Sequence, residues 1–316
     1  MIETVVEVAL PVDEKLMIQK NRITPAGGQE RKRRISIVTG THGDELEGQY
    51  VCYEVQRIIR EHPECLTGVV DIYPALNPLG IDSITRGIPQ FDLDMNRIFP
   101  GSKEGVFTEY VAAEIVDDIL GSDVCIDIHA SNIYLREIPQ VRISEETAER
   151  LVPLAMHLNV DFIWVHESAT VLESTLAHSL NMMSVPTLVV EMGVGMRITK
   201  EYCRQLVTGI FHLMKELGIW NGEAEEVREP FISLNGEVDF VNADASGIFV
   251  PEVEIGTYLE RGGHIGDILN PLTGEVENSL KASIAGTVFT VREYPIVYHG
   301  SLIARILGGT KQWKKK

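Results

Sequence analysis

Residues 39–48 have the sequence T-G-T-H-G-D-E-L-E-G and follow the apolar run 35–38. The apolar run predicts a short buried strand. The two glycines on either side of His42 are typical of a tight turn that leads into a helix, which we expect to begin near Glu45. His42 and Glu45 lie three residues apart, so an imidazole nitrogen and a carboxylate oxygen can meet at one divalent ion. This pair of ligands suits zinc.

A second apolar run, 124–128, ends at His129. Strand ends of this kind are where open α/β sheets place their sites, so His129 is the expected third ligand. Asp127 lies two residues earlier, and on a strand it shares a face with His129. Its carboxylate can therefore orient the imidazole. The sequence predicts one metal ion per chain, held by His42, Glu45 and His129.

Three further blocks complete an ordered pattern. N-P-L-G at 77–80 follows a third apolar run, 69–73, and precedes Arg86; D-L-D-M-N-R-I-F-P-G occupies 92–101; V-E-M-G occupies 190–193. The ordered set of H-G-D-E, N-P-x-G with a later Arg, D-x-N-R-x-F-P-G, D-x-H and V-E-M-G resembles the succinylglutamate desuccinylase/aspartoacylase family. That family belongs with the zinc carboxypeptidases, and the resemblance covers roughly residues 35–195.

Glu191 is the expected general base. It follows four apolar residues, where a surface glutamate is hard to explain, although a salt-bridged structural glutamate is the alternative. A carboxylate beside a zinc-activated water must accept its proton and pass it to the leaving amine, because an amine departs poorly as an anion. The family resemblance implies the same role for the glutamate of V-E-M-G.

The resemblance also implies roles for two arginines. Arg86 would stabilise the oxyanion of the tetrahedral intermediate, whereas Arg97 with Asn96 would hold the carboxylate of the substrate. A tyrosine from the C-terminal region contacts substrate in related enzymes. Tyr298 is the candidate, with Tyr134 and Tyr294 as alternatives. The alternative for the two arginines is ion pairing with Asp92 and Asp94 of their own loop. Arg136 and Arg142 are either a second carboxylate contact or surface residues.

The expected activity is hydrolysis of the amide bond of a small N-acyl amino acid or related amide, with one zinc ion as cofactor. A metallocarboxypeptidase acting on short peptides is the alternative enzyme, and a catalytically silent binding protein on the same fold is the alternative from another class. Residues 40–48 do not form a phosphate-binding loop, since no Gly-Lys-Ser/Thr follows. Specificity is expected to come from a loop at 132–142 and from the C-terminal region.

Charge and composition exclude several kinds of partner. The 316 residues carry a net charge of −18, which argues against a nucleic-acid surface and against binding to anionic membranes. The start of the chain lacks the basic and apolar regions of a signal peptide, and no apolar run is long enough to span a membrane. We expect a cytoplasmic homo-oligomer that acts on a small molecule.

The four cysteines lack the C-x-x-C spacing of a metal or redox motif, and we expect them to be reduced. They are Cys52, Cys65, Cys125 and Cys203. Strand alternation places Cys125 on the face of Asp127 and His129, where a nucleophile is conceivable. Its apolar neighbours favour a buried structural thiol instead.

Strands and helices are predicted to alternate through the first two thirds of the chain. Strands are expected at 4–10, 35–38, 69–73, 124–128, 162–165 and 186–190, and helices at 46–59, 108–120, 145–158, 173–182 and 199–217. A hairpin or loop is expected at 11–34 and a loop at 77–103. Such alternation predicts an α/β domain, doubly wound around a mostly parallel, mixed sheet. The resemblance implies the zinc-carboxypeptidase type of this fold for residues 1–225.

Residues 226–316 have a different sequence pattern, in which short apolar runs are separated by glycines. They predict a smaller all-β domain that resembles the lipoyl/biotinyl barrel-sandwich in its two similar halves. Lipoyl and biotin are attached to a lysine at the hairpin between the halves, but the matching tip, 270–275, contains none, and Lys281 falls in the next expected strand. We therefore predict no covalent cofactor, and a role as a lid or an oligomerisation surface.

Overall fold

The computed structural model of the chain describes residues 1–26, 33–166, 173–233 and 238–308. The strands before residue 200 are β1 (Ile2–Ala9), β2 (Lys15–Ile23), β3 (Arg34–Thr39), β4 (Val69–Tyr73), β5 (Val124–His129), β6 (Leu135–Ser144), β7 (Phe162–His166) and β8 (Thr187–Gly193). The α-helices are α1 (Glu47–Glu61), α2 (Pro78–Ser83), α3 (Phe107–Ile119), α4 (Ala148–Ala155), α5 (Leu176–Met182) and α6 (Lys200–Glu216). The later strands are β9 (Phe231–Ser233), β10 (Val238–Asn242), β11 (Gly247–Pro251), β12 (Tyr258–Leu259), β13 (His264–Asn270), β14 (Glu275–Lys281), β15 (Gly286–Arg292), β16 (Ile296–Val297) and β17 (Leu302–Gly308).

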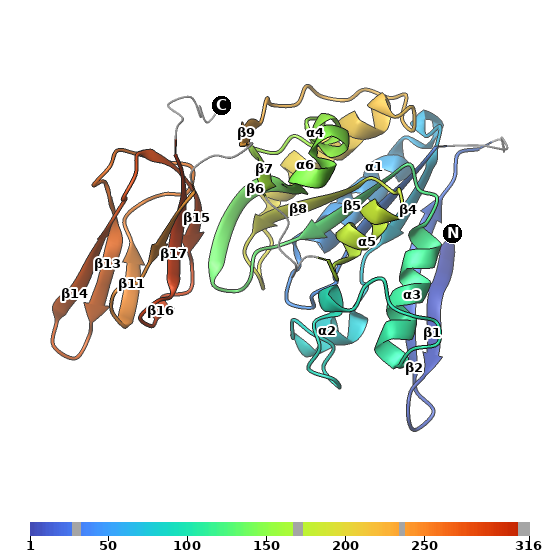
Figure 1. Cartoon of the computed structure of the whole chain (residues 1–316). Coiled ribbons are helices and arrows are strands. Elements are labelled where there is room, and N and C mark those ends of the chain that lie inside the picture. Colours follow the sequence, from blue (N-terminus) through green and yellow to red (C-terminus); the bar gives the residue numbers. More distant parts are fainter. Residues whose placement is uncertain (27–32, 167–172, 234–237, 309–316) are drawn as a thin grey trace.

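The main sheet is mixed, as predicted, and its middle is parallel (Figure 1). Its path runs β1-β2-β4-β3-β5-β8-β6 and continues through β15, β17 and β10. The pairs β4–β3, β3–β5 and β5–β8 are parallel, whereas β2 and β6 add antiparallel strands on either side. The carboxyl ends of β3, β5 and β8 therefore lie side by side, which brings the segments after them together.

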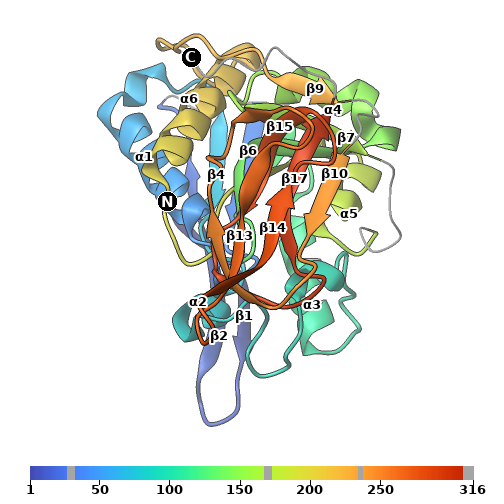
Figure 2. The ribbon, with the colours of Figure 1, turned by 90° about the vertical axis from the view of Figure 1, so that its left-hand side faces the viewer.

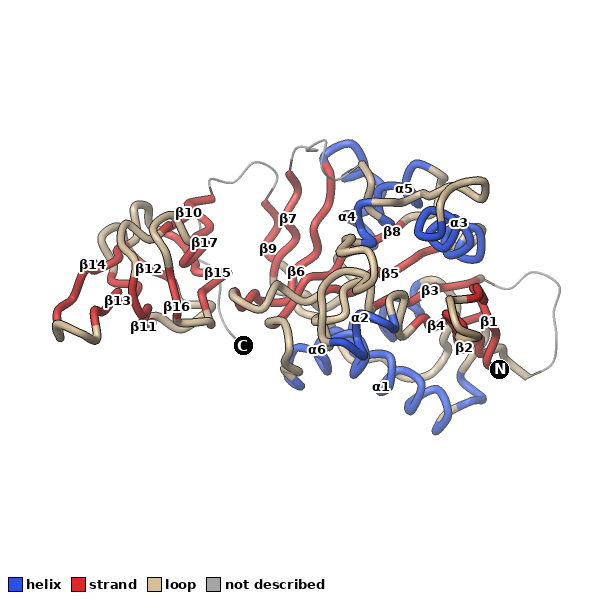
Figure 3. Tube along the Cα trace, turned by 90° about the horizontal axis from the view of Figure 1, so that it is seen from below, coloured by secondary structure: helices blue, strands red, loops and turns tan. Residues whose placement is uncertain are grey.

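Helices cover both faces of the sheet, α1 and α6 on one side and α3 and α5 on the other (Figure 3). Alternate residues of each central strand point to opposite faces. Ile35 and Ile37 of β3 therefore belong to the core with α1 and α6, and Val38 belongs to the core with α3 and α5. Because both faces are covered, the strands are continuous apolar runs, which is why they were predictable.

One predicted loop is a strand. The expected loop at 132–142 was wrong, because β6 spans Leu135–Ser144 and lies between β8 and the C-terminal strand β15. Its five polar and charged residues and Pro139 hid the strand signal. The stretch 11–34, expected to be a hairpin or loop, contains β2, which forms a hairpin with β1, and the expected loop at 77–103 contains the short helix α2.

The C-terminal residues form a smaller β-rich domain with a separate sheet, in the order β14-β13-β11-β16. They enclose their own apolar core, drawn from residues after 240. Figure 2, in which the C-terminal strands face the viewer, shows β15 and β17 beside β6, where they continue the main sheet. We propose to keep the division at residue 225, although β9 returns to pair with β7 of the first domain.

No helix in the described ranges is long and apolar enough to cross a membrane.

Candidate active site

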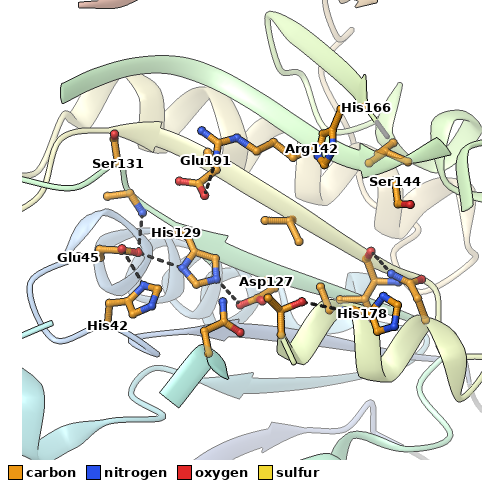
Figure 4. A pocket seen from close by; sticks show the side chains of 18 of the residues that line it. His42, Glu45, Asp127, His129, Ser131, Arg142, Ser144, His166, His178 and Glu191 are labelled. Atoms are coloured by element: carbon orange, nitrogen blue, oxygen red, sulfur yellow. Dashed lines mark hydrogen bonds and ion pairs between the residues drawn. The ribbon is translucent and has the colours of Figure 1, made fainter. Parts of the chain in front are cut away.

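Three side chains gather where β3 and β5 end (Figure 4). His42 and Glu45 lie in the turn between β3 and α1, and His129 is the last residue of the neighbouring β5. The three are 3%, 4% and 4% exposed, respectively. His42 Nδ1 lies 2.7 Å from one carboxylate oxygen of Glu45, and His129 Nδ1 lies 3.0 Å from the other. Glu45 thus stands between the two imidazoles.

This cluster could hold a metal ion. Each residue offers one ligand atom, and the three atoms lie within 4.8 Å of one another. His42 Nδ1 is buried and points at the Glu45 carboxylate 2.7 Å away, but the angle does not make a hydrogen bond. Two imidazole nitrogens and one carboxylate oxygen are the donor set of catalytic zinc sites, so the residues fit this group.

A carboxylate lies behind each imidazole. His42 Nε2 lies 2.9 Å from Asp94 Oδ1, and His129 Nε2 lies 3.2 Å from Asp127 Oδ1. Such carboxylates fix the ring orientation of ligating histidines and make them better ligands. The placement of Asp127 follows the prediction from strand alternation. Asp94 was considered only as an ion-pair partner within its loop, and its distance of 52 residues from His42 in the chain left no signal of this contact.

The electrostatics of the cluster follow from these pairs. Burial opposes charge on Glu45, yet His42 and His129 lower the pKa of its carboxyl well below the usual range. Burial likewise lowers the pKa of His129, but Asp127 and Glu45 outweigh it and raise that pKa well above its ordinary value. The carboxylates therefore favour a positive charge at this point, either a proton on an imidazole or a bound cation.

Close backbone approach joins the His42 turn to the segment that carries Arg86. A Cβ atom on Gly43 would lie 2.0 Å from the carbonyl carbon of Gly80 and 2.4 Å from the amide nitrogen of Ile81, so only glycine fits. The Gly43 amide donates to the Arg86 carbonyl at 3.3 Å. The Arg86 guanidinium in turn donates to Glu45 at 2.8 Å, beside the expected metal position.

Glu191 lies on the neighbouring strand. It is the cross-strand partner of His129 in the β5–β8 pair, and its side chain is 16% exposed. Burial raises the pKa of Glu191, and the guanidinium of Arg142, 3.3 Å away, offsets only part of this shift. A carboxyl with a raised pKa is suited to carrying a proton in both directions.

One cavity of about 530 Å³ brings these residues together. The predicted site residues that line it are His42, Glu45, Arg86, Asn96, Arg97, Asp127, His129 and Glu191. Ser144, His166 and His178 lie at the end opposite His42 (Figure 4). Asn96 Oδ1 accepts from the Leu176 amide at 2.9 Å, so this side chain also fixes the start of α5. Glu137 and Arg305 line the cavity as well and were missed from the sequence.

None of the three candidate tyrosines lies with the other predicted site residues. Tyr298 is 71% exposed and does not line the cavity as far as the described residues define it. Tyr134 and Tyr294 pack edge to face with ring centres 5.7 Å apart, and neither lines the cavity. Arg136 pairs with Glu293 at 3.0 Å outside the lining, whereas Arg142 lies within it.

Cys125 is fully buried, and burial raises the pKa of its thiol well above the ordinary value. It is absent from the cavity lining formed by the described residues. A thiol of this kind is an inert core residue, in line with the structural alternative.

One family model matches most of the first domain. Residues 31–217, more than half of the chain, match the succinylglutamate desuccinylase/aspartoacylase catalytic domain. The chain is 26% identical to N-alpha-acetyl-L-2,4-diaminobutyric acid deacetylase of Halomonas elongata over 235 residues, which span 72% of this chain and 67% of the relative. The product-bound ectoine utilization protein EutE (DoeB) of Ruegeria pomeroyi has a TM-score of 0.78 at 20% identity, covering 93% of this chain and 90% of that chain. A succinylglutamate desuccinylase/aspartoacylase of Rhodobacter sphaeroides has a TM-score of 0.77 at 23% identity, covering 95% and 91%. At such identities the structural likeness shows a shared fold.

Proposed function

This chain belongs to the succinylglutamate desuccinylase/aspartoacylase family, and from that premise we propose that it is a zinc-dependent hydrolase of the amide bond in a small N-acyl amino acid or related amide. The observation that carries the proposal is the buried cluster of His42, Glu45 and His129 in one cavity with Glu191. The relative from Halomonas elongata is a deacetylase named for an N-acetylated amino acid, which supports the substrate class.

His42, Glu45 and His129 would hold the zinc ion. When bound there, zinc would polarise the amide carbonyl and lower the pKa of a water molecule towards neutrality. Asp94 and Asp127 would keep the two imidazoles in the orientation that binding requires, since each lies within 3.2 Å of a ring nitrogen directed away from Glu45.

Glu191 would move the proton. Its carboxylate takes a proton from the attacking water and returns it to the amide nitrogen, so that the amine leaves as a neutral molecule. The raised pKa of Glu191 supports this assignment, because burial has made the protonated form accessible. Its position beside His129 supports a short path between water and leaving group.

The two loop arginines would serve opposite ends of the substrate. Arg86 lies against Glu45, where its guanidinium can balance the negative charge that develops on the carbonyl oxygen. Arg97 lines the cavity and is exposed, so it can pair with a carboxylate that enters from solvent. The Nη1 group of Arg97 is also held by the Asn96 carbonyl at 2.7 Å, which restricts the guanidinium.

Amine release from a panel of N-acetyl, N-succinyl and N-formyl amino acids tests the function. The expected result is turnover of at least one class by the zinc-loaded protein, and loss of about 10²- to 10⁴-fold in kcat in Glu191→Gln with its zinc content retained. Turnover of short peptides in place of the panel would favour a metallocarboxypeptidase. Activity that is unchanged in Glu191→Gln would overturn the assignment of the base.

A further inference from the structure

We propose that Arg305, which the C-terminal domain contributes, is a positioning residue of the active site. Through the buried carboxylate of Glu137 it holds Arg142 against Glu191. The inference rests on the proposed function, in which Glu191 carries the proton, and it makes the C-terminal domain part of the catalytic apparatus.

The strand register aligns these residues in one row. Glu137 of β6 pairs with Thr290 of β15, and Thr290 pairs with Arg305 of β17. On its other side Glu137 pairs with Gly193 of β8, two residues after Glu191. The Arg305 side chain therefore crosses only one strand to reach Glu137, and it lines the cavity as it does so.

Each oxygen of Glu137 serves a different domain. Oε2 accepts from Gln140 Nε2 at 2.9 Å and from Arg142 Nη2 at 2.7 Å, both on β6. Oε1 accepts from Arg305 Nη1 and lies 3.5 Å from the Thr290 hydroxyl. Glu137 is 1% exposed, so its charge depends on these partners rather than on water.

A β-bulge creates the arrangement. Along β6 the step from Glu137 to Gln140 is three residues, whereas the paired residues of β8, Gly193 and Glu191, are two apart. Regular alternation would place Glu137 and Gln140 on opposite faces, but the extra residue in the bulge restores them to one face. Pro139 lies within the bulge, where a missing amide hydrogen is tolerated.

Arg142 is the link between this row and the proposed base. Its Nη2 group bonds to Glu137, and its Nη1 group lies 3.3 Å from Glu191 Oε1. Arg305 supplies the second guanidinium to Glu137, which leaves Arg142 free to divide its charge between two carboxylates. Without Arg305, the buried Glu137 would draw Arg142 towards itself and away from Glu191.

A second ion pair joins the same two domains and provides a matched control. Arg136 of β6 pairs with Glu293, just after β15, at 3.0 Å, and neither residue lines the cavity. If an inter-domain tie were all that mattered, the loss of either pair would have the same effect.

The test compares steady-state kinetics of Arg305→Met, Arg305→Lys and Glu293→Gln on a substrate that the wild type hydrolyses. We expect Arg305→Met to lower kcat by about 10- to 100-fold, the effect of a small displacement of a catalytic group, with KM changed by less than about twofold. Arg305→Lys should recover part of the loss, and Glu293→Gln should keep the wild-type kcat. A wild-type kcat in Arg305→Met, or an equal fall in Glu293→Gln, would overturn the inference.

Two further variants decide the question if Arg305→Met fails to fold. The double variant Glu137→Gln/Arg305→Met leaves no buried carboxylate unpaired, and because Arg305 acts through that carboxylate, its kcat should equal that of Glu137→Gln alone. A kcat of the double variant well below that of Glu137→Gln overturns the inference. The kcat of Arg142→Met/Arg305→Met should be no lower than that of Arg142→Met alone, since both arginines act on Glu191. If the fold losses in kcat of the two single variants multiply in the double variant, the two arginines act independently and the inference is contradicted. If the wild type releases no amine from any panel member, the proposed function fails and this inference fails with it.

Discussion

Single residues behind the metal cluster bear directly on its affinity for zinc. Asp94 and Asp127 each lie close to the ring nitrogen that faces away from Glu45, and both are carboxylates with no role as a proposed ligand. Asp94 also accepts from the Asn96 amide at 2.9 Å, so it is fixed by its own loop before any metal binds. A carboxylate held in place in this way fixes the orientation of the imidazole before the metal binds.

Asp94→Asn is expected to weaken zinc binding by about 10- to 100-fold, because the amide keeps the bond to Asn96 but loses the charge behind His42. Competition with a chromophoric chelator measures the affinity. Asp92→Asn, two residues away in the same loop and exposed, is the matched control, since asparagine also tolerates the left-handed backbone of that position. Equal affinities in the two variants would remove Asp94 from the site.

Arg97→Ala is expected to raise KM with little change in kcat, because the proposed contact is with a substrate carboxylate that takes no part in the reaction. The loss should shrink for a substrate amidated at that carboxylate. Arg97→Lys should recover only part of the affinity, since an ammonium cannot form paired N–H contacts. A fall in kcat that is the same for charged and amidated substrates would instead assign Arg97 to the transition state.

At the scale of elements, the turn between β3 and α1 is where the fold and the site depend on each other most. Gly43→Ala is expected to cost about 3 kcal/mol or more of unfolding free energy, because its Cβ would meet the backbone of Gly80 and Ile81, which cannot rotate away. Urea unfolding of the metal-free protein measures this, so that metal binding does not contribute.

Gly274→Ala, at the tip of the β13–β14 hairpin, is the control for Gly43→Ala. Its Cβ would meet nothing within 4 Å, so only the left-handed backbone opposes it, at about 1–2 kcal/mol. A loss in Gly43→Ala no greater than in this control would mean that the turn can move away from α2 at little cost.

Elements buried on both faces were predictable, and those at the junction of the domains were not. β4 has the predicted bounds because four of its five residues are apolar, Asp71 being the exception, and turns lie on either side. β6 was missed because its inward-facing polar residues pair with one another and with Arg305 of the distant β17, so local hydrophobicity carries no sign of burial. The same reason explains why Glu137 was not considered as a site residue.

The proximity of His42 and His129 was predictable because it depends only on strand ends. His42 follows β3 and His129 ends β5, and adjacent parallel strands bring their carboxyl ends together whatever the rest of the fold does. Arg305 could not be found in this way, since its contact with Glu137 spans 168 residues and depends on the β6–β15–β17 register. Tyr298 was suggested by resemblance alone.

At the scale of the whole molecule, the two domains share a sheet rather than a flexible joint. The β6–β15 pair makes backbone contacts beside Glu191, so motion of the C-terminal domain would be transmitted to the proposed base.

The hairpin tip at 270–275 contains no lysine, and Lys281 lies at the end of β14. Intact mass of the purified chain is expected to equal the sequence mass, and an added mass on Lys281 would contradict this.

The central claim is that hydrolysis depends on one zinc ion held by His42, Glu45 and His129. The most direct measurement is amine release from the best panel substrate as zinc is added in steps to chelator-treated protein. Activity is predicted to be absent at the start, to rise linearly, and to stop rising at one equivalent of zinc per chain, while His129→Ala stays inactive throughout. Full activity in the metal-free protein, or a wild-type response in His129→Ala, would contradict the account.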